Sequence, residues 1–222
     1  MERALFFLKP DAVVRRHAGA KVLSRVVALG CIPKAFVSLR PSRQFLEEKH
    51  YYMHKGKPFF DWLLDYITSE SLIVTILEGN NIIPKIRQAL GPATVERAVL
   101  ESPSSIRAQY GMFRGVNLAH ASDSESSALH EVGTWSSNFS LRDDDQALET
   151  LEDYVSRNSD CEFVESVLYR RIAEQLEKRT MSRGEAKEHI FTLLKRENTL
   201  LDNAMLEHFI DLTMDAIEPN SG

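Results

Sequence analysis

His120 is the residue whose surroundings best suit covalent chemistry. It follows a short apolar segment, 116–119, that is typical of a strand, and it precedes Ser122 to Glu125, whose S-x-x-E form is a helix-capping pattern. An imidazole is partly unprotonated near pH 7, so it can attack an electrophilic phosphorus atom and later release the phosphoryl group to a second acceptor. A lone histidine in such a place is also often an ordinary structural residue, and this segment alone leaves both interpretations open.

Lys9 is the second residue in unusual surroundings. It closes the apolar run ALFFL, which predicts a buried strand that stops at a turn at Pro10. An ammonium group at the end of a buried strand has a high free-energy cost unless an anion or a carboxylate meets it. We therefore expect Lys9 to bind a negatively charged group.

The elements that position these residues follow from the periodicity of apolar residues. Apolar runs predict strands over 4–10, 31–39, 72–77 and 116–119, and helical spacing or capping signals predict helices over 19–29, 42–52, 59–68, 81–90 and 122–135. Residues 91–116 show only weak periodicity and read as a long functional connection that carries Arg97, Arg107 and Arg114. This order of elements predicts an α+β fold, a ferredoxin-like four-stranded antiparallel sheet with helices on one face.

The chain changes character near Leu141. A polar linker is expected over 136–145, and we predict a first domain over 1–140 and a small all-α C-terminal extension over 141–222. Residues 1–140 hold 17 Lys and Arg minus 13 Asp and Glu, a net +4, whereas 141–222 hold 10 minus 19, a net −9. Three or four short helices in the extension could pack together or against the first domain, and its acidic residues read most simply as a solvated helix surface.

Composition excludes several classes of protein. With 222 residues and 43% hydrophobic residues, the chain can bury one good core and a second small one. It has no apolar run long enough for a membrane span and no secretory leader, so we expect a soluble protein with the cytoplasm as its default location. Cys31 and Cys161 lie far apart and read as reduced thiols. The small basic excess of the first domain suits a nucleotide but does not predict a specific nucleic-acid surface.

Four segments of the chain together resemble the motifs of nucleoside diphosphate kinases. They occur in the expected order and near the expected spacing, and they read ERALFFLKPDAV, HYYMHKGKPFF, SSIRAQYG and VNLAHASDS. One such motif would be weak evidence, but four in order over about residues 1–135 are hard to obtain by chance. The resemblance implies the nucleoside diphosphate kinase type of the fold predicted above. The extension from Leu141 resembles nothing in the family core.

The resemblance also implies roles for individual residues. His120 would be the phosphorylated residue, Glu131 would orient its ring, and Tyr51 would place a hydroxyl near it. The expected phosphate-binding cations are Lys9, Arg87 and Arg107, and the other expected nucleotide-binding residues are Asn117 for the sugar hydroxyl, Phe59 for stacking on the base and Thr94 for a phosphate. Each has a plainer alternative: Tyr51 could simply pack against Tyr52, and Arg87 and Glu131 could be solvated helix residues.

Several positions depart from the family pattern. Ala93 replaces a threonine that contacts phosphate, which is why Thr94 is considered in its place, and Val95 replaces a loop proline that takes part in assembly contacts. Ala121 replaces a glycine and would be strained by about 1 kcal/mol if that position needs a positive φ. Val116 replaces an arginine, and Arg114 stands where the family has a small apolar residue. Reduced activity is one expectation from Ala93, Val95 and Ala121.

The leading functional hypothesis is phosphoryl transfer from a nucleoside triphosphate to a nucleoside diphosphate by a ping-pong mechanism through phosphorylated His120. Mg²⁺ would bind through the nucleotide phosphates, so no metal-ligand cluster in the protein is expected. The family resemblance implies a homo-oligomer. One alternative is a partly degenerate nucleotide-binding scaffold whose acidic helical extension docks a protein partner. Another is transfer of the phosphoryl group from phosphohistidine to a protein.

Overall fold

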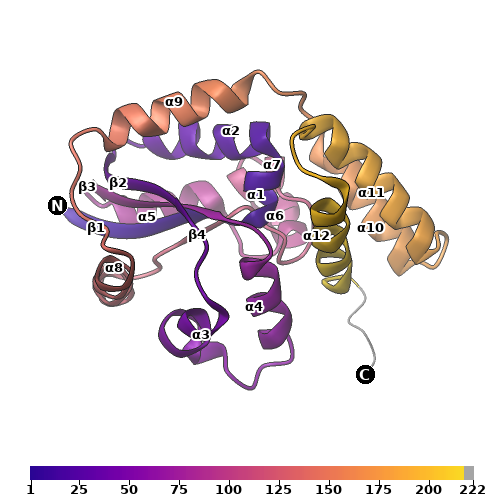
Figure 1. Cartoon of the computed structure of the whole chain (residues 1–222), viewed down its shortest axis with the longest axis horizontal. Helices are drawn as coiled ribbons and strands as arrows, with labels where there is room; N and C mark the ends of the chain where they lie inside the picture. The colour runs from indigo at the N-terminus through magenta and orange to yellow at the C-terminus, as the bar shows by residue number, and fades with distance from the viewer. Residues whose placement is uncertain (218–222) are drawn as a thin grey trace.

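The computed structural model describes residues 1–217, and its centre is a four-stranded antiparallel sheet with the strand order β2-β3-β1-β4 (Figure 1). The strands are β1 (Glu2–Leu8), β2 (Ile32–Leu39), β3 (Leu72–Gly79) and β4 (Ala119–Ala121). β1 lies between β3 and β4, which explains its continuous apolar sequence, because a central strand is covered on both faces. The predicted α+β fold with a ferredoxin-like antiparallel sheet is confirmed.

Helices cover both faces of this sheet, whereas one covered face was expected. The helices of the first part are α1 (Pro10–Val14), α2 (Arg16–Val27), α3 (Arg43–Phe45), the π-helical η1 (Leu46–His50), the 3₁₀-helical η2 (Tyr52–His54), α4 (Phe60–Thr68), α5 (Ile82–Leu90), α6 (Val95–Glu101), α7 (Ile106–Tyr110) and α8 (Glu125–Phe139). Leu5 and Phe7 of β1 join one core with residues of α3 and α4, while Ala4, Phe6 and Leu8 join a second core with α2 and α5. Alternate residues of a strand point to opposite faces, so the apolar run of β1 serves both cores.

The last strand and the helix after it differ from the sequence prediction. β4 contains His120 at its centre rather than ending before it, because the backbone of Leu118 has a φ of 78° and breaks the extended conformation there. The capping box forms between Ser124 and Ser127, two residues later than predicted. α8 then continues to Phe139, so the first residues of the expected linker are helical.

Two short helices were missed between residues 91 and 116. α6 buries only Val95 and Ala98, and α7 buries Ile106, Arg107 and Ala108, so neither has enough apolar residues to show a helical period. Pro10 was expected at a turn, but it begins α1. Proline suits this first helical position because its missing N–H would have no partner there.

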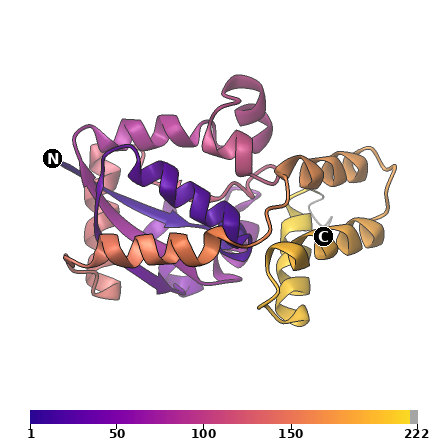
Figure 2. The same ribbon diagram turned by 90° about the horizontal axis from the view of Figure 1, so that it is seen from above.

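The extension consists of α9 (Ala147–Ser159), α10 (Ser166–Glu177), α11 (Arg183–Glu197) and α12 (Asn203–Asp215), and it packs along the first part. α9 lies against α2 and β2, and α10 to α12 gather at the end of the sheet, where α12 contacts α4 (Figures 1 and 2). Tyr169, Leu194 and Phe209 belong to the same core as Phe7 and α4. The boundary at residues 140/141 stays a prediction, since the two parts share this core.

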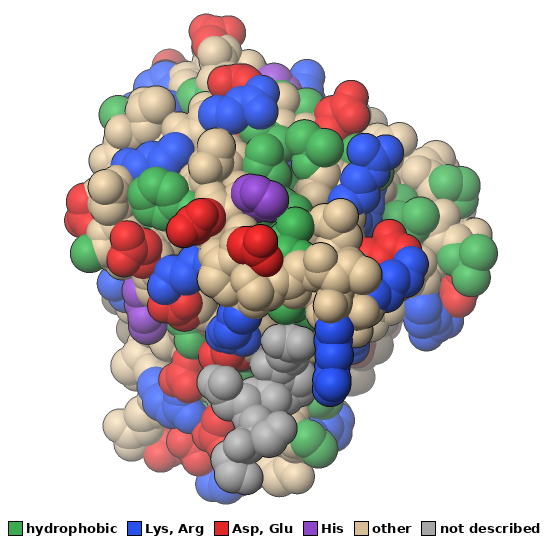
Figure 3. Space-filling model, turned by 90° about the vertical axis from the view of Figure 1, so that its right-hand side faces the viewer, with side chains coloured by type: hydrophobic (Ala, Val, Ile, Leu, Met, Phe, Trp, Pro, Cys, Tyr) green, Lys and Arg blue, Asp and Glu red, His purple; other side chains and the backbone are tan. Residues whose placement is uncertain are grey.

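The outer side of the extension carries charges of both signs. Lys and Arg side chains are interspersed with Asp and Glu over the face in Figure 3. This pattern is typical of a solvated helix surface rather than of a surface that binds a polyanion. Within residues 1–217, every helix is too short or too polar to cross a lipid bilayer.

Trp135 tests how far the core beneath β1 supports the fold. Its ring is fully buried, stacks on Phe7 at 5.3 Å and packs edge-on against Phe45 at 5.1 Å. We expect Trp135→Ala to lower the free energy of unfolding by about 3–5 kcal/mol through the cavity that it leaves. Ser137→Ala, at an exposed position of the same helix, should change it by less than about 0.5 kcal/mol. Urea denaturation of both variants checks this, and equal losses would contradict it.

Candidate active site

His120 is held against the centre of the sheet with its ring still accessible. It pairs with Phe7 across β4 and β1, and its ring stacks on Phe7 with 4.8 Å between centroids. Neighbouring residues of paired strands point to the same face, so the register itself creates this contact. The His120 side chain is 20% exposed, which leaves it open to a ligand.

Glu131 supplies the orienting contact for this ring. Its Oε1 lies 3.0 Å from Nε2 of His120, and its Oε2 accepts a hydrogen bond of 2.6 Å from the hydroxyl of Ser122. Burial by itself would raise the pKa of Glu131, but the neighbouring His120, His50 and Ser122 hold that pKa below its usual value. An ionised Glu131 accepts a hydrogen bond from the Nε2–H group, so the neutral tautomer of His120 carries its lone pair on Nδ1. No hydrogen bond to Nδ1 is formed within the described residues.

A second histidine lies behind the first. His50 is almost wholly buried, and its ring meets that of His120 edge-on at 4.6 Å. Its Nδ1 accepts a hydrogen bond of 3.3 Å from the indole of Trp135, and its Nε2 has no partner within residues 1–217. Burial and the nearby His120 keep the pKa of His50 well below its usual value. His50 is therefore a neutral packing residue, and sequence reasoning did not single it out.

His50, His120 and Glu131 also form the one group in the described part of the chain that could hold a metal ion. One ligand atom from each residue lies within 4.8 Å of the others. Glu131, however, already accepts hydrogen bonds from His120 and Ser122, which accounts for its charge without an ion. We therefore interpret the group as a hydrogen-bonded assembly around His120.

A cluster of buried polar groups lies where β1 ends. The ammonium of Lys9 donates a hydrogen bond of 2.8 Å to the Asn117 side chain, which in turn donates to the carbonyl of Ala93 at 2.5 Å. Arg107 is also buried and donates to the backbone carbonyls of Asn117 and Ala119 at 3.3 and 3.0 Å. Lys9, Arg107 and Asn117, which the resemblance implicated, thus lie together next to the strand that carries His120.

Burial lowers the pKa values of Lys9 and Arg107. Burial, together with the nearby charge of Arg107, lowers the pKa of Lys9 to about 8. Burial and the charge of Arg87 lower the pKa of Arg107 to about 10. Asp11 offsets this only in part, and neither cation forms an ion pair within residues 1–217, so the two buried positive charges favour the binding of an anion.

Asp11 organises the backbone beside these cations and was not identified from the sequence. Its fully buried carboxylate accepts hydrogen bonds from the hydroxyl of Tyr66 at 2.6 Å and from the backbone N–H of Leu118 at 3.0 Å. The second contact, with the bond of 2.8 Å from the N–H of Lys9 to the carbonyl of Leu118, holds Leu118 in its positive-φ conformation. The only sequence signal was an acidic residue in the first turn of α1, which capping alone would explain.

The remaining predicted residues surround this cluster. Arg87 is exposed in the last turn of α5, and Thr94 is exposed at the start of α6. Tyr51 is buried, its ring centroid 6.5 Å from that of His120, and burial raises the pKa of its hydroxyl. Phe59 is 45% exposed at the start of α4, so it is free to stack on a ring. Their nucleotide-binding roles stay predictions.

Two of the departures from the family pattern have a clear structural outcome. Ala121 lies in β4 opposite Phe6 and outside the positive-φ region, so the expected backbone strain at this position is absent. Val95 is buried at the start of α6, and its N–H donates to the carbonyl of Arg114 at 3.2 Å. Nothing in the structure explains Ala93 beyond the contact of its carbonyl with Asn117.

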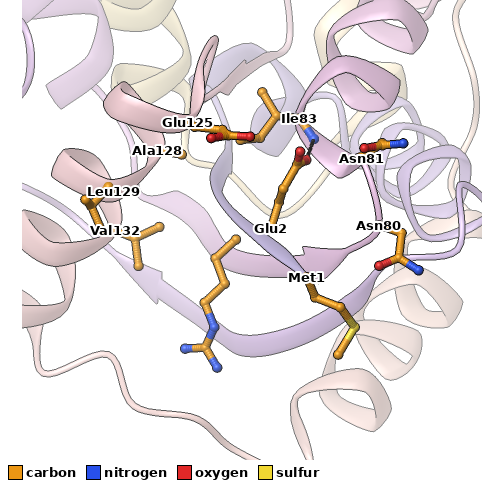
Figure 4. Close-up of a pocket in the computed structure, with 10 residues that line it drawn as sticks. Met1, Glu2, Asn80, Asn81, Ile83, Glu125, Ala128, Leu129 and Val132 are labelled. Carbon is orange, nitrogen blue, oxygen red and sulfur yellow. Dashed lines mark hydrogen bonds between the residues drawn. The ribbon is translucent and has the colours of Figure 1, made fainter.

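One hollow of the surface is separate from these residues. It has a volume of about 780 Å³ and lies between the start of β1, α8 and the start of α5 (Figure 4). Its lining includes Met1, Ile83, Leu129 and Val132, and Glu2 points across it to the backbone N–H of Ile83. It contains none of the residues expected to act on a nucleotide.

This geometry is suited to nucleophilic attack on an anionic substrate. One imidazole nitrogen is held by a carboxylate, the other is unbonded within residues 1–217, and buried cations contact Asn117 and Ala119 just before His120 in the chain. Phosphoryl transfer needs such fixed positive charge and positioning more than it needs a strong base.

Comparison with known proteins supports the same chemistry. Residues 2–141 match the family model described as nucleoside diphosphate kinase. The nucleoside diphosphate kinase of Corynebacterium jeikeium is 40% identical over 138 residues, 62% of this chain and 98% of that protein. A crystal structure of the Aquifex aeolicus nucleoside diphosphate kinase, 38% identical, matches 60% of this chain and 93% of that chain with a TM-score of 0.56. A halophilic nucleoside diphosphate kinase from Halobacterium salinarum in complex with CDP, 30% identical, matches 68% and 97% with a TM-score of 0.58.

The lowered pKa of Lys9 predicts how anion binding depends on pH. Lys9 loses its charge as the pH rises through about 8, so a phosphate-bearing ligand should bind more weakly above that pH. Between pH 7 and pH 9 we expect the dissociation constant for ADP to rise roughly tenfold, in proportion to the lost protonated fraction. In Lys9→Arg the guanidinium stays charged, and the slope should flatten. Calorimetric titrations of both proteins check this; parallel slopes would assign the titration to another group.

Proposed function

The chain belongs to the nucleoside diphosphate kinase family, and we propose that it carries the transferred phosphoryl group on Nδ1 of His120. It is a phosphotransferase acting on nucleotides, as its relatives are. The observation that carries the assignment of His120 is its bond to Glu131, which occupies Nε2 and leaves Nδ1 as the nucleophile. A structural histidine would have no need of an oriented tautomer beside buried cations.

The proposed cycle has two half-reactions. Nδ1 of His120 attacks the γ-phosphorus of a nucleoside triphosphate, the P–N bond forms, and the bond from that phosphorus to the bridging oxygen breaks. The nucleoside diphosphate leaves with the electron pair. A terminal phosphate oxygen of a second nucleoside diphosphate then attacks the phosphohistidine, and the pair of the P–N bond returns to Nδ1. This ping-pong course needs no other reactant.

The surrounding residues divide the remaining work in this proposal. Lys9, Arg87 and Arg107 neutralise the phosphate oxygens, and Asn117 donates to the sugar hydroxyl. Phe59 stacks on the base, Thr94 offers a hydroxyl in place of the missing one at Ala93, and Tyr51 places its hydroxyl near the ring. Stacking tolerates any base, so broad acceptance of bases follows.

Mg²⁺ fits this proposal as part of the nucleotide. The nearby carboxylates of Asp11 and Glu131 are already engaged by hydrogen bonds, so the site offers cations rather than a cage of oxygen ligands. Bound to the phosphates, the ion supplies charge neutralisation at the transferred group.

The decisive experiment is phosphorylation of the full chain with γ-labelled ATP and Mg²⁺. We expect an acid-labile label on the protein that disappears when a nucleoside diphosphate is added. His120→Ala should lose the label, whereas His189→Ala, an exposed histidine on α11, should keep it. Chelation by EDTA should lower labelling by at least about a hundredfold, because the metal neutralises charge in the transition state.

Other outcomes would point to the alternative functions. A stable label that resists every diphosphate would support transfer to a protein. Intact nucleotide binding without a label would support the scaffold and would contradict catalysis through His120.

Self-association is the assembly that we propose, following the family resemblance. The hollow beside Leu129 is a suitable contact surface, because Leu129 is 81% and Met1 82% exposed there. Sedimentation analysis should show a species larger than one chain, and Leu129→Glu should shift it towards the monomer. A wild-type chain that stays monomeric at all concentrations would contradict this.

Two further proposals concern the setting of the protein. We propose the cytoplasm as the location, since the activity needs a pool of nucleotides. A protein partner for the extension also stays a prediction, and only the outer sides of its helices are open to such a partner, because Tyr169, Leu194 and Phe209 face the shared core.

A further inference from the structure

The segment that joins Arg107 to Asn117 depends on the C-terminal extension for its outer contacts. Both residues belong to the proposed nucleotide site, and Arg107 donates directly to the carbonyl of Asn117 at 3.3 Å. A shift of the residues between them would therefore move both ends of the site. We call residues 108–116 the site segment.

Arg170 of α10 binds the first turn of the site segment. Its guanidinium donates to the carbonyls of Ala108 and Gly111 at 3.1 and 3.0 Å. Gly111 packs so closely that a Cβ would lie 2.6 Å from the carbonyl oxygen of Arg107 and from a methyl group of Val95. The segment thus packs closely against α6 and is hydrogen-bonded to an arginine of the extension.

Arg15, paired with Glu197, binds the carbonyl of Tyr110 in the site segment. Arg15 donates to the carbonyl of Tyr110 at 2.6 Å and pairs with Glu197 at 2.8 Å, and both charged side chains are fully buried. Glu197 also accepts from the hydroxyl of Tyr169 and from the N–H of Val164. Because the extension supplies this counter-charge, it keeps Arg15 in place between the site segment and α11.

The tip of the site segment is held at two further points. Arg114 has a φ of 46°, and its guanidinium pairs with Glu177 at the end of α10 at 2.7 Å. Trp62 packs on Gly115, where a Cβ would lie 3.2 Å from its ring, and its indole donates to the carbonyl of Leu212 in α12 at 2.7 Å. The extension therefore contacts the segment directly or through one side chain at its start, middle and tip.

We propose that the C-terminal extension is an intramolecular clamp that positions the site segment for nucleotide binding, with Arg170 and Glu177 as positioning residues. This proposal rests on the proposed function, because it assumes that Arg107 and Asn117 bind the nucleotide. If the extension only stabilised the fold, releasing its contacts would lower the melting temperature and leave nucleotide affinity unchanged. If it is a clamp, releasing these contacts must raise the dissociation constant for the nucleotide.

The test uses the full chain and four variants, of which Arg170→Lys is the conservative replacement. Arg170→Met keeps the apolar stem but removes the donors to Ala108 and Gly111, Glu177→Ala releases Arg114, and Glu174→Ala is the matched control on the same helix, whose exposed carboxylate pairs only with Lys178 in the described structure. Calorimetry measures the dissociation constant for Mg-ADP, thermal unfolding measures stability, and steady-state kinetics separate KM from kcat.

Arg170→Met should weaken Mg-ADP binding about fivefold to tenfold, because only part of the effect of losing its charge-assisted hydrogen bonds reaches the nucleotide. Glu177→Ala should weaken it about twofold to threefold, because the pair is solvent-exposed. KM should rise with kcat nearly unchanged, Arg170→Lys should restore part of the affinity, and Glu174→Ala should match the wild type.

An unchanged dissociation constant in Arg170→Met, with a lowered melting temperature, would overturn the clamp and leave the extension a stabilising element. Tighter binding in Glu177→Ala would remove Glu177 from the proposal. Failure of the proposed function has a different signature, because wild-type His120 would then take no label whether or not these variants bind ADP more weakly.

Discussion

The structure depends on how the fold accommodates buried positive charge. Lys9, Arg15 and Arg107 are all buried, and an unpaired charge in a protein interior is far more costly than a paired one. Asp11 and Glu197 are the buried carboxylates that meet them, and they do so unequally. Arg15 receives a direct partner in Glu197, whereas within residues 1–217 the hydrogen bonds of the Lys9 and Arg107 side chains go to amide and carbonyl oxygens. The positive charges of Lys9 and Arg107 thus remain available to a phosphate. The extension neutralises Arg15 through Glu197.

The backbone beside His120 bends at one residue, Leu118. Leu118 adopts a positive φ of 78° just before β4, whereas Ala121 lies within β4 and outside the positive-φ region. That conformation would be unfavourable for leucine on its own, and the buried carboxylate of Asp11 holds it by accepting the Leu118 N–H. The position of His120 therefore depends on Asp11 in α1 as well as on β4, through the hydrogen bonds that hold Leu118.

Sequence reasoning succeeded where the signal was local. The apolar run of β1 and the helical periods of α2, α4 and α5 predicted the sheet and most of its cover, and motif positions located the residues that do converge, Lys9, Arg107, Asn117 and His120 with Glu131. It missed α6 and α7, which bury too few apolar residues to show a period. It also missed Asp11, Arg15 and Glu197, because the contacts that define them join residues 107 and 182 positions apart and leave no local pattern.

The ion pair of Arg15 with Glu197 also determines when this protein can finish folding. The two residues are separated by 182 positions, and Tyr169, Leu194 and Phe209 join the core beneath β1 from equally late in the chain. During synthesis the first 140 residues emerge from the ribosome with Arg15 still lacking its carboxylate and part of that core still uncovered. Domains usually fold in order as they are translated. Here the amino-terminal region reaches its final packing only after residues up to Phe209 have been made, so its nascent form leaves part of that apolar core exposed.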